Sequence, residues 1–262
     1  IGNDYIYGGA GDDHIDGDDT DTGTTNGTSD TVDYSSIAIS ADTGDTRDVD
    51  GTGADTTTTD AYNGIEIDLT IATAQRIHAE YGTDTITNIE NVVGSDYDDV
   101  FITNLTTANM IDGGETDTIG TGALYGEELV GDYVDYSSNG ATKIVVDLST
   151  TDIDGYSTVT VSGTSAANDK LKNIENIKGT SGNDVITGDD GKNTLLGMGG
   201  NDVLNGLGGD DYIDGGSGND TITCGAGADK LFGRTGNDTF RDSDFTGDTI
   251  DGGTESDGSR GS

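Results

Sequence analysis

A carboxylate recurs every nine residues in the C-terminal part of the chain. From residue 179 to residue 241, seven consecutive nonapeptides carry Gly at the fourth position and Asp, or once Asn, at the sixth. Carboxylate and carbonyl oxygens are the ligands that calcium and magnesium prefer, whereas zinc and copper accept nitrogen and sulfur. Because these carboxylates repeat with the architecture and no HExxH, G-x-S-x-G or P-loop accompanies them, we expect cation binding rather than catalysis.

Each nonapeptide must form a loop and a short strand to position its carboxylate. Glycines at the first and fourth positions allow positive φ and tight turns. Positions 7 to 9 read as an extended segment in which only the apolar eighth residue points inward. One apolar residue in nine cannot form a core alone, but stacked copies can. Stacking also places the carboxylates at about 5 Å spacing, where they repel unless a cation lies between them.

The composition supports this interpretation. The 262 residues are 30% hydrophobic, and 51 Asp and Glu against 11 Lys and Arg give a formal net charge of -40. This charge excludes nucleic acid as a partner and disfavours anionic membranes. The single cysteine, Cys224, allows no internal disulfide. No signal peptide or membrane span is expected, and because the sequence begins and ends within the repeat pattern we expect a piece of a longer protein.

The repeat resembles GGxGxDxUx, the signature of the RTX (repeats-in-toxin) calcium-binding family. The resemblance implies an all-β fold, a right-handed parallel β-roll with two nonapeptides per turn, interrupted here by strand-rich inserts. It implies several Ca²⁺ ions in rows between loops, held by the sixth-position side chains and by carbonyls of the loop glycines. The side-chain ligands would be Asp184, Asn193, Asp202, Asp211, Asp220, Asp229 and Asp238. The carbonyl ligands would come from the loops of Gly182, Gly191, Gly200, Gly209, Gly218, Gly227 and Gly236.

Less regular copies extend the set of candidate ligands. IGNDYIY and GGAGDDHID at the N-terminus place Asp4 and Asp13 in ligand positions. After residue 93 the repeat is degenerate, with Asp99 and Asp117 as candidates although Tyr97 replaces a loop glycine. Asn193 lacks the charge, so its site should be weaker.

A longer repetition lies between the regular tracts. DTVDYSS at 30–36 returns as DYVDYSS at 132–138, and NIENVVG at 88–94 returns as NIENIKG at 173–179. Alternating runs such as STVTVS at 157–162 predict β-strands in these inserts, whereas AQRIHAE around His78 is compatible with a helical turn. The expected segments are: N-terminal nonapeptides, 1–16; first insert, 17–93; degenerate RTX segment, 94–131; second insert, 132–178; regular roll, 179–241; truncated repeat and linker, 242–262.

These features predict a non-enzymatic calcium-binding module. The resemblance implies a type I secreted bacterial protein that is extracellular or attached to the cell surface and folds on binding calcium. A surface adhesin or S-layer protein fits best. The alternative is the non-catalytic C-terminal module of a secreted protease, lipase, epimerase or cytolysin, and an ice-binding β-solenoid is less favoured because the outward seventh positions are mixed. Expected partners are calcium ions and, as candidates, copies of the chain or neighbouring repeat modules, without direct membrane insertion.

Overall fold

The computed structural model shows a chain built from short β-strands. The residues that it describes are 5–9, 13–17, 30–36, 64–71, 75–78, 82–87, 89–103, 108–114, 122–124, 127–129, 131–137, 141–162, 168–241 and 247–254. No helix occurs within these ranges, and therefore none that could cross a membrane.

The chain forms two compact units. The N-terminal unit comprises Ile1–Phe101 and Ile111–Asp132, and the C-terminal unit comprises Ile102–Met110 and Tyr133–Ser262. The strands up to the second insert are β1 (Tyr5–Tyr7), β2 (His14–Asp16), β3 (Thr31–Asp33), β4 (Glu66–Asp68), β5 (Gln75–His78), β6 (Gly82–Thr87), β7 (Asn91–Val93), β8 (Val100–Ile102), β9 (Met110–Asp112), β10 (Gly122–Leu124) and β11 (Glu127–Leu129). The remaining strands are β12 (Tyr133–Asp135), β13 (Lys143–Asp147), β14 (Ser157–Ser162), β15 (Asp169–Lys172), β16 (Asn176–Lys178), β17 (Val185–Thr187), β18 (Thr194–Leu196), β19 (Val203–Gly208), β20 (Tyr212–Asp214), β21 (Thr221–Ala226), β22 (Lys230–Phe232), β23 (Thr239–Arg241) and β24 (Thr249–Asp251).

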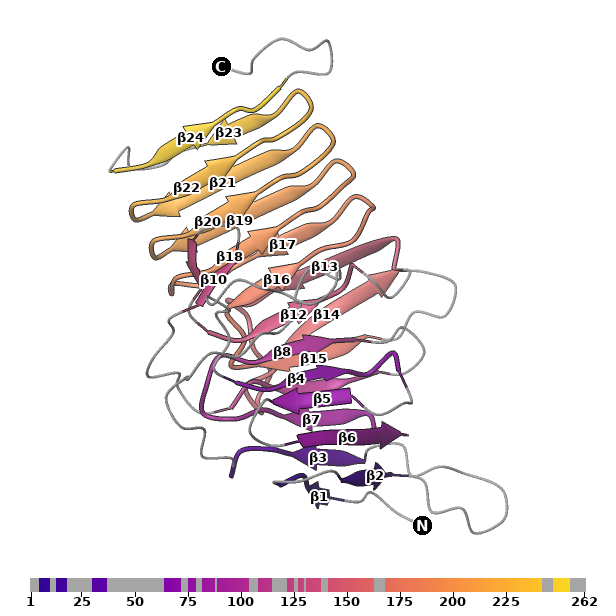
Figure 1. Cartoon of the computed structure of the whole chain (residues 1–262). Coiled ribbons are helices and arrows are strands. Elements are labelled where there is room, and N and C mark those ends of the chain that lie inside the picture. Colours follow the sequence, from indigo (N-terminus) through magenta and orange to yellow (C-terminus); the bar gives the residue numbers. More distant parts are fainter. Residues whose placement is uncertain are drawn as a thin grey trace. The chain divides into compact units, whose positions relative to one another are not determined.

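The regular repeats of the C-terminal unit form two stacked parallel sheets (Figure 1). One sheet contains β17, β19, β21 and β23, and the other contains β16, β18, β20, β22 and β24. Ile186 pairs with Leu204, and Leu204 pairs with Ile222. This register advances by two nonapeptides, so successive nonapeptides lie on opposite sheets. The predicted all-β parallel roll is confirmed.

The core between the sheets consists of the eighth-position side chains. Six of them are completely buried: Ile186, Leu195, Leu204, Ile213, Ile222 and Leu231. At the C-terminal end of the stack Ile250 is 45% exposed. Because each buried residue contacts copies from neighbouring coils, the core is a ladder whose stability depends on stacking.

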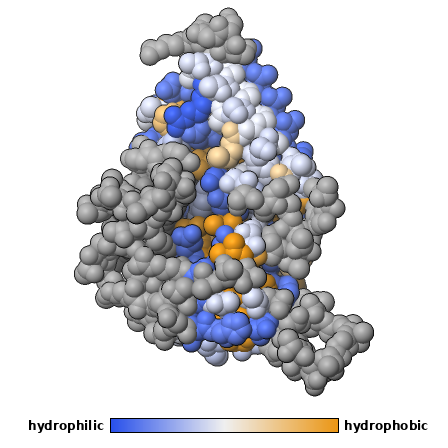
Figure 2. Space-filling model, turned by 45° about the vertical axis from the view of Figure 1, so that its right-hand side comes forward, coloured by the Kyte–Doolittle hydropathy of each residue, from blue (hydrophilic) through white to orange (hydrophobic). Residues whose placement is uncertain are grey.

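The two sheets also separate the outward-facing seventh positions, which look mixed when they are read along the chain. In-register pairing forms one row of β-branched residues on the first sheet: Val145, Val185, Val203, Thr221 and Thr239. On the other sheet, the seventh positions Thr194 and Tyr212 are buried, contrary to expectation, and Lys230 and Thr249 are exposed. In Figure 2 the part that holds this stack is coloured mainly white to blue, as expected from its outward Thr, Asn and Asp residues.

The second insert widens the first sheet of the roll. Strand β13 pairs in parallel with β17 and antiparallel with β14, which in turn pairs antiparallel with β15. Strand β14 covers the predicted run Ser157–Ser162. Along it, buried and exposed side chains alternate, as expected for a strand with one face on the core.

The N-terminal unit contains related elements. Strands β1, β3 and β7 pair in parallel, and β2 pairs in parallel with β6. His14 is exposed at the seventh position, as expected. The prediction of a helical turn around His78 is wrong, because Gln75–His78 form β5, which pairs antiparallel with β6. The backbone hydrogen bonds of that pairing outweigh the weak local preference.

Candidate metal-binding loops

The sixth-position carboxylates form a ladder of hydrogen bonds along the roll. The amide nitrogen of Asp202 donates to Oδ1 of Asp220, one coil later, at 2.8 Å. The equivalent bonds run from Asp184 to Asp202 at 2.7 Å, from Asp220 to Asp238 at 2.9 Å, from Asn193 to Asp211 at 2.9 Å and from Asp211 to Asp229 at 2.8 Å. One oxygen of each carboxylate is therefore fixed by the coil that precedes it.

In several of the sixth-position carboxylates, the second oxygen is buried without a hydrogen-bond donor. Within the described part of the chain, Oδ2 has no hydrogen-bond partner in Asp202, Asp211, Asp220, Asp238 and Asp248. A buried carboxylate oxygen that lacks a donor is costly, and a cation is the natural compensation. The residues present therefore fit a bound cation.

Further oxygens converge beside the first-position glycine of each loop. A Cβ atom added to Gly197 would lie 2.5 Å from Oδ2 of Asp202 and 2.6 Å from the carbonyl oxygen of Gly215. At Gly206 the corresponding atoms are Oδ2 of Asp211 and the carbonyl oxygen of Cys224. Oxygens from two successive coils thus surround a space that a side chain would fill.

The backbone conformations correct one sequence expectation. The first-position glycines do not adopt positive φ, whereas from residue 197 onward the second and fourth positions do, for example Gly216 at 92° and Gly218 at 135°. Even the non-glycine second-position residues Met198, Leu207 and Arg234 have φ of 71°, 76° and 67°. At Gly197 and Gly206 the first position therefore needs glycine for space, although Cys224 occupies the same position in a later repeat, and the second and fourth positions provide the turn.

Burial and mutual repulsion disfavour the charged form of these side chains. Burial, with a smaller contribution from the neighbouring carboxylates, raises the pKa of Asp202 to about 8, of Asp211 to about 7 and of Asp220 to about 6. Burial also raises the pKa of Asp184 and Asp238. A bound cation would reverse this tendency, because it favours the ionised carboxylate.

The comparison with protein families decides the identity of the loops. Four copies of the RTX calcium-binding nonapeptide repeat match, at residues 1–21, 173–204, 187–222 and 205–240. These tracts are RTX calcium-binding repeats. No curated protein matches the chain. The RTX assignment identifies calcium as the ion that the ladder would hold, and RTX repeats occur in secreted bacterial proteins.

Three of the predicted RTX ligand residues have a different environment. Oδ2 of Asp184 accepts the amide of Thr180 at 2.6 Å, and Oδ2 of Asp99 accepts the amide of Ser95 at 2.5 Å. The side-chain oxygen of Asn193 accepts the amide of Asp189 at 2.9 Å. In each case the donor is the second-position residue of the same loop.

The remaining predicted ligands are at the N-terminus and in the degenerate segment. The amide of Asp13 donates to Oδ1 of Asp84 at 3.0 Å, which continues the ladder pattern across the first insert. Asp4 and Asp117 lie outside the described residues.

Sequence analysis missed one residue of the RTX ladder. Oδ1 of Asp248 accepts the amide of Asp229 at 2.9 Å, so Asp248 takes the next sixth position. Asp229 and Asp248 are 19 residues apart, whereas sixth positions in successive coils are otherwise 18 residues apart. Because of this extra residue, Asp248 does not fit the regular nine-residue register. The order Gly247-Asp248-Thr249-Ile250 is the signal that could have identified it.

Carboxylates alone do not build a metal site here. Among the described residues, no three His, Cys, Asp or Glu side chains come together as a metal-binding cluster. The RTX ions must therefore depend on carbonyl oxygens as well as on Asp. This requirement explains why the glycine backbone repeats as strictly as the carboxylate does.

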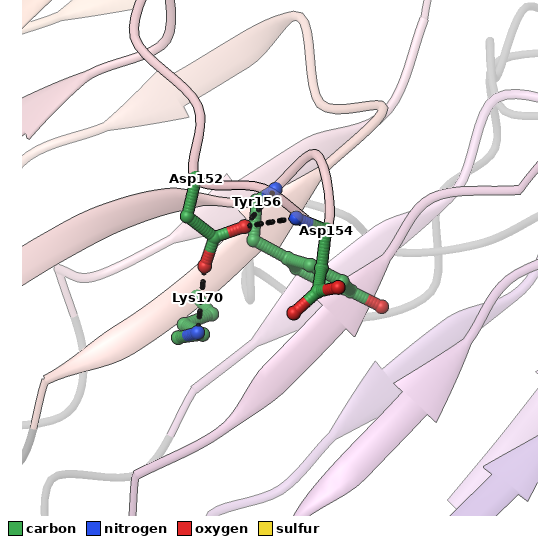
Figure 3. Close-up of polar contacts among 4 residues, drawn as sticks. All are labelled: Asp152, Asp154, Tyr156 and Lys170. Atoms are coloured by element: carbon green, nitrogen blue, oxygen red, sulfur yellow. Dashed lines mark hydrogen bonds and ion pairs between the residues drawn. The ribbon is translucent and has the colours of Figure 1, made fainter.

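The acidic loop between β13 and β14 shows how a carboxylate is satisfied without a cation. One oxygen of Asp152 accepts the amides of Asp154 and Tyr156, both at 3.0 Å, and the other lies 2.7 Å from Nζ of Lys170 (Figure 3). The hydrogen bond from Lys170 is the largest cause of the lowered pKa of Asp152. This carboxylate organises its loop and joins it to β15.

Proposed function

We propose that the chain is an extracellular, non-catalytic structural module of a larger bacterial surface protein, an adhesin or S-layer protein, and that it folds on binding calcium after secretion. The observation that carries the proposal is the row of buried Oδ2 atoms without donors in successive coils. Without cations, these oxygens and the net charge of -40 oppose the compact state. Calcium at extracellular concentration removes that opposition.

The affinity needed for such a switch is modest. Extracellular calcium modules bind with dissociation constants of about 10⁻⁴ to 10⁻³ M. The coils that need calcium would therefore stay unfolded where free calcium is scarce, which suits export through a type I system, and would condense outside the cell.

Far-UV circular dichroism during calcium and magnesium titrations tests this function. Starting from chelated protein, calcium should increase the β signal at the expense of coil, whereas magnesium at the same concentration should not. A β spectrum that is unchanged by chelator would refute coupled binding and folding.

The alternative is that the module belongs to the C-terminal part of a secreted enzyme or toxin. The described residues favour a structural role, because the sixth-position carboxylates repeat with the coil instead of converging at one place. A cavity of about 230 Å³ beside the second insert is lined by residues that include Lys172, Glu175 and Asp189 but neither His nor Cys. The sequence of the complete parent protein would distinguish the two, since an enzyme requires a catalytic motif elsewhere.

Ice binding is a second candidate function, because the β-branched residues on the first sheet form a regular row. Its members have the regular strand spacing of about 4.8 Å, and only Thr221 and Thr239 of the five carry hydroxyl groups. Thermal hysteresis of the calcium-loaded protein tests this function. Thr221→Lys should abolish hysteresis while Thr249→Lys, on the other sheet, should leave it unchanged; absence of hysteresis in the wild type removes the candidate.

A further inference from the structure

The first coil of the regular roll satisfies its polar groups without a cation. Oδ1 of Asp184 accepts the amide of Ile144 at 2.7 Å, and Oδ2 accepts the amide of Thr180. The Thr180 hydroxyl lies 3.1 Å from both oxygens. Asp184 is thus surrounded by protein donors, although it is as deeply buried as Asp220, two coils further on the same sheet.

The opposite loop of the same coil is closed in the same way. The side-chain oxygen of Asn193 accepts the amide of Asp189, and its Nδ2 donates to the carbonyl oxygen of Glu175 at 2.9 Å. An amide supplies both a donor and an acceptor and carries no charge to neutralise. The substitution of Asn for Asp at this position therefore agrees with a loop that needs no cation.

The second-position residue distinguishes the two kinds of loop. Thr180 and Asp189 avoid the left-handed region, and their amides point at the sixth-position side chain. Met198, Leu207 and Arg234 adopt positive φ, and the carboxylates of their loops receive no donor on Oδ2. The change from one kind of loop to the other falls between Asn193 and Gly197.

In the second insert, on which this first coil stacks, a buried carboxylate is also satisfied by protein donors. Oδ1 of Asp169 accepts the amide of Asn109 at 2.8 Å. The buried Tyr136 hydroxyl lies beside the same carboxylate and stabilises it, although it does not reach regular hydrogen-bond geometry. Strand β13 then pairs directly with β17 of the first coil.

We propose that calcium dependence in the C-terminal unit begins at Gly197. The second insert and residues 179–196 form a platform held by protein donors, and residues 197–254 wind onto it, coil by coil, when calcium binds. This inference rests on the proposed function, because it concerns the same ions. It assigns the ions to the loops with positive φ at the second position and removes Asp184 and Asn193 from the ligands.

Residue-resolved hydrogen exchange on the full chain tests the boundary. The backbone amides of Ile144 and Thr180 donate hydrogen bonds to the Asp184 carboxylate. In chelator, these two amides should exchange at least ~10-fold more slowly than the amides of Asp202 and Asp211. Calcium should then protect the second pair. Equal exchange of the two pairs in chelator would overturn the platform.

A matched pair of variants tests the ligand assignment. Asp184→Asn and Asp220→Asn each keep an oxygen to accept the amide bond from the preceding strand or coil, and both lie on the same sheet. Equilibrium dialysis with calcium should give Asp184→Asn the same number of bound ions as the wild type and Asp220→Asn fewer. If Asp184→Asn loses as many ions as Asp220→Asn, the boundary at Gly197 is wrong.

The two experiments separate this inference from the proposed function. A wild type that binds no calcium in dialysis refutes the proposed function. Calcium binding with equal losses in both variants leaves the function standing and refutes only the boundary.

Discussion

The hydroxyl group of Tyr34 donates a hydrogen bond of 2.7 Å to Oδ2 of Asp84, and both residues are buried. In the regular roll, the corresponding oxygen of Asp202 or Asp220 has no donor. Tyr34 therefore supplies, from within the first insert, what a cation must supply in the roll. Burial and the bond to Asp84 raise the pKa of Tyr34 well above its usual range, so the hydroxyl stays protonated.

Replacing Tyr34 by Phe should destabilise the N-terminal unit. The Asp84 carboxylate would keep the Asp13 amide on Oδ1 but lose the hydrogen bond from Tyr34 on Oδ2, which costs about 1–3 kcal/mol. Denaturant unfolding at saturating calcium measures the loss. Tyr7→Phe, at a ring that is 65% exposed, is the matched control and should have little effect; equal effects of the two variants would contradict the role of the hydroxyl.

Truncation of an eighth-position side chain should destabilise the protein much more where that side chain is fully buried than where it is exposed. Ile213→Ala, at a side chain with 0% exposure, should lower the free energy of unfolding by about 2–5 kcal/mol. Ile250→Ala removes the same atoms from a side chain that is 45% exposed and should cost less than ~1 kcal/mol. Denaturant midpoints of the calcium-loaded variants check this difference, and a loss at Ile250 as large as that at Ile213 would argue against the ladder.

The fourth-position Gly218 cannot be replaced by alanine without strain. Gly218 has φ of 135°, and an added Cβ would lie 1.6 Å from the carbonyl oxygen of Gly200, a backbone atom that cannot move aside. Gly218→Ala should therefore lower the free energy of unfolding by more than ~2 kcal/mol. Gly208→Ala, where the nearest atom would be 3.5 Å away, should change it by less than ~1 kcal/mol. Thermal melting of the two variants in calcium provides the test, and similar melting temperatures would be inconsistent with the clash.

Asp169 should make the C-terminal unit less stable as the pH rises. Burial raises its pKa from 3.8 to about 7. Because the folded state holds the proton more tightly than the unfolded state, this stabilising contribution is complete below about pH 4 and is lost as the pH rises through 7. Each unit of pKa difference corresponds to about 1.4 kcal/mol.

The Asp169→Asn variant isolates that effect. Asn cannot ionise but keeps an oxygen for the amide of Asn109. Between pH 4 and pH 7 at constant saturating calcium, the free energy of unfolding of the wild type should fall relative to the variant. A difference between the two proteins that does not change with pH would show that Asp169 does not titrate in this range.

Most of the fold could be predicted from the nine-residue period of the sequence. Large apolar side chains at Ile186, Leu204 and Ile222 predict an inward ladder because nothing else in the repeat can form a core, and all three are fully buried. Strand β14 was predicted because Thr and Val alternate along it. These features depend on local pattern and stacking alone, which a single sequence records.

The environments of individual carboxylates could not be predicted from the same pattern. Asp184 and Asp202 have identical positions in their repeats, but the second-position residue, Thr180 or Met198, differs in backbone conformation and in the donors that it offers. The contact between Tyr34 and Asp84 joins residues 50 positions apart, across a span in which the repeat is lost. Such contacts depend on how the inserts fold back, which the nine-residue period does not specify.

The alternation of successive repeats between two sheets restricts how such a chain can change in length. Loss of one nonapeptide, such as Gly206–Asp214, would preserve the local motif but transpose every later repeat to the opposite sheet, so that Thr221 would take the position of Tyr212. Loss or duplication of two consecutive nonapeptides would leave both surfaces as they are. If the outer faces of the two sheets have different functions, this roll should therefore lose or gain repeats during evolution only in whole coils of two nonapeptides.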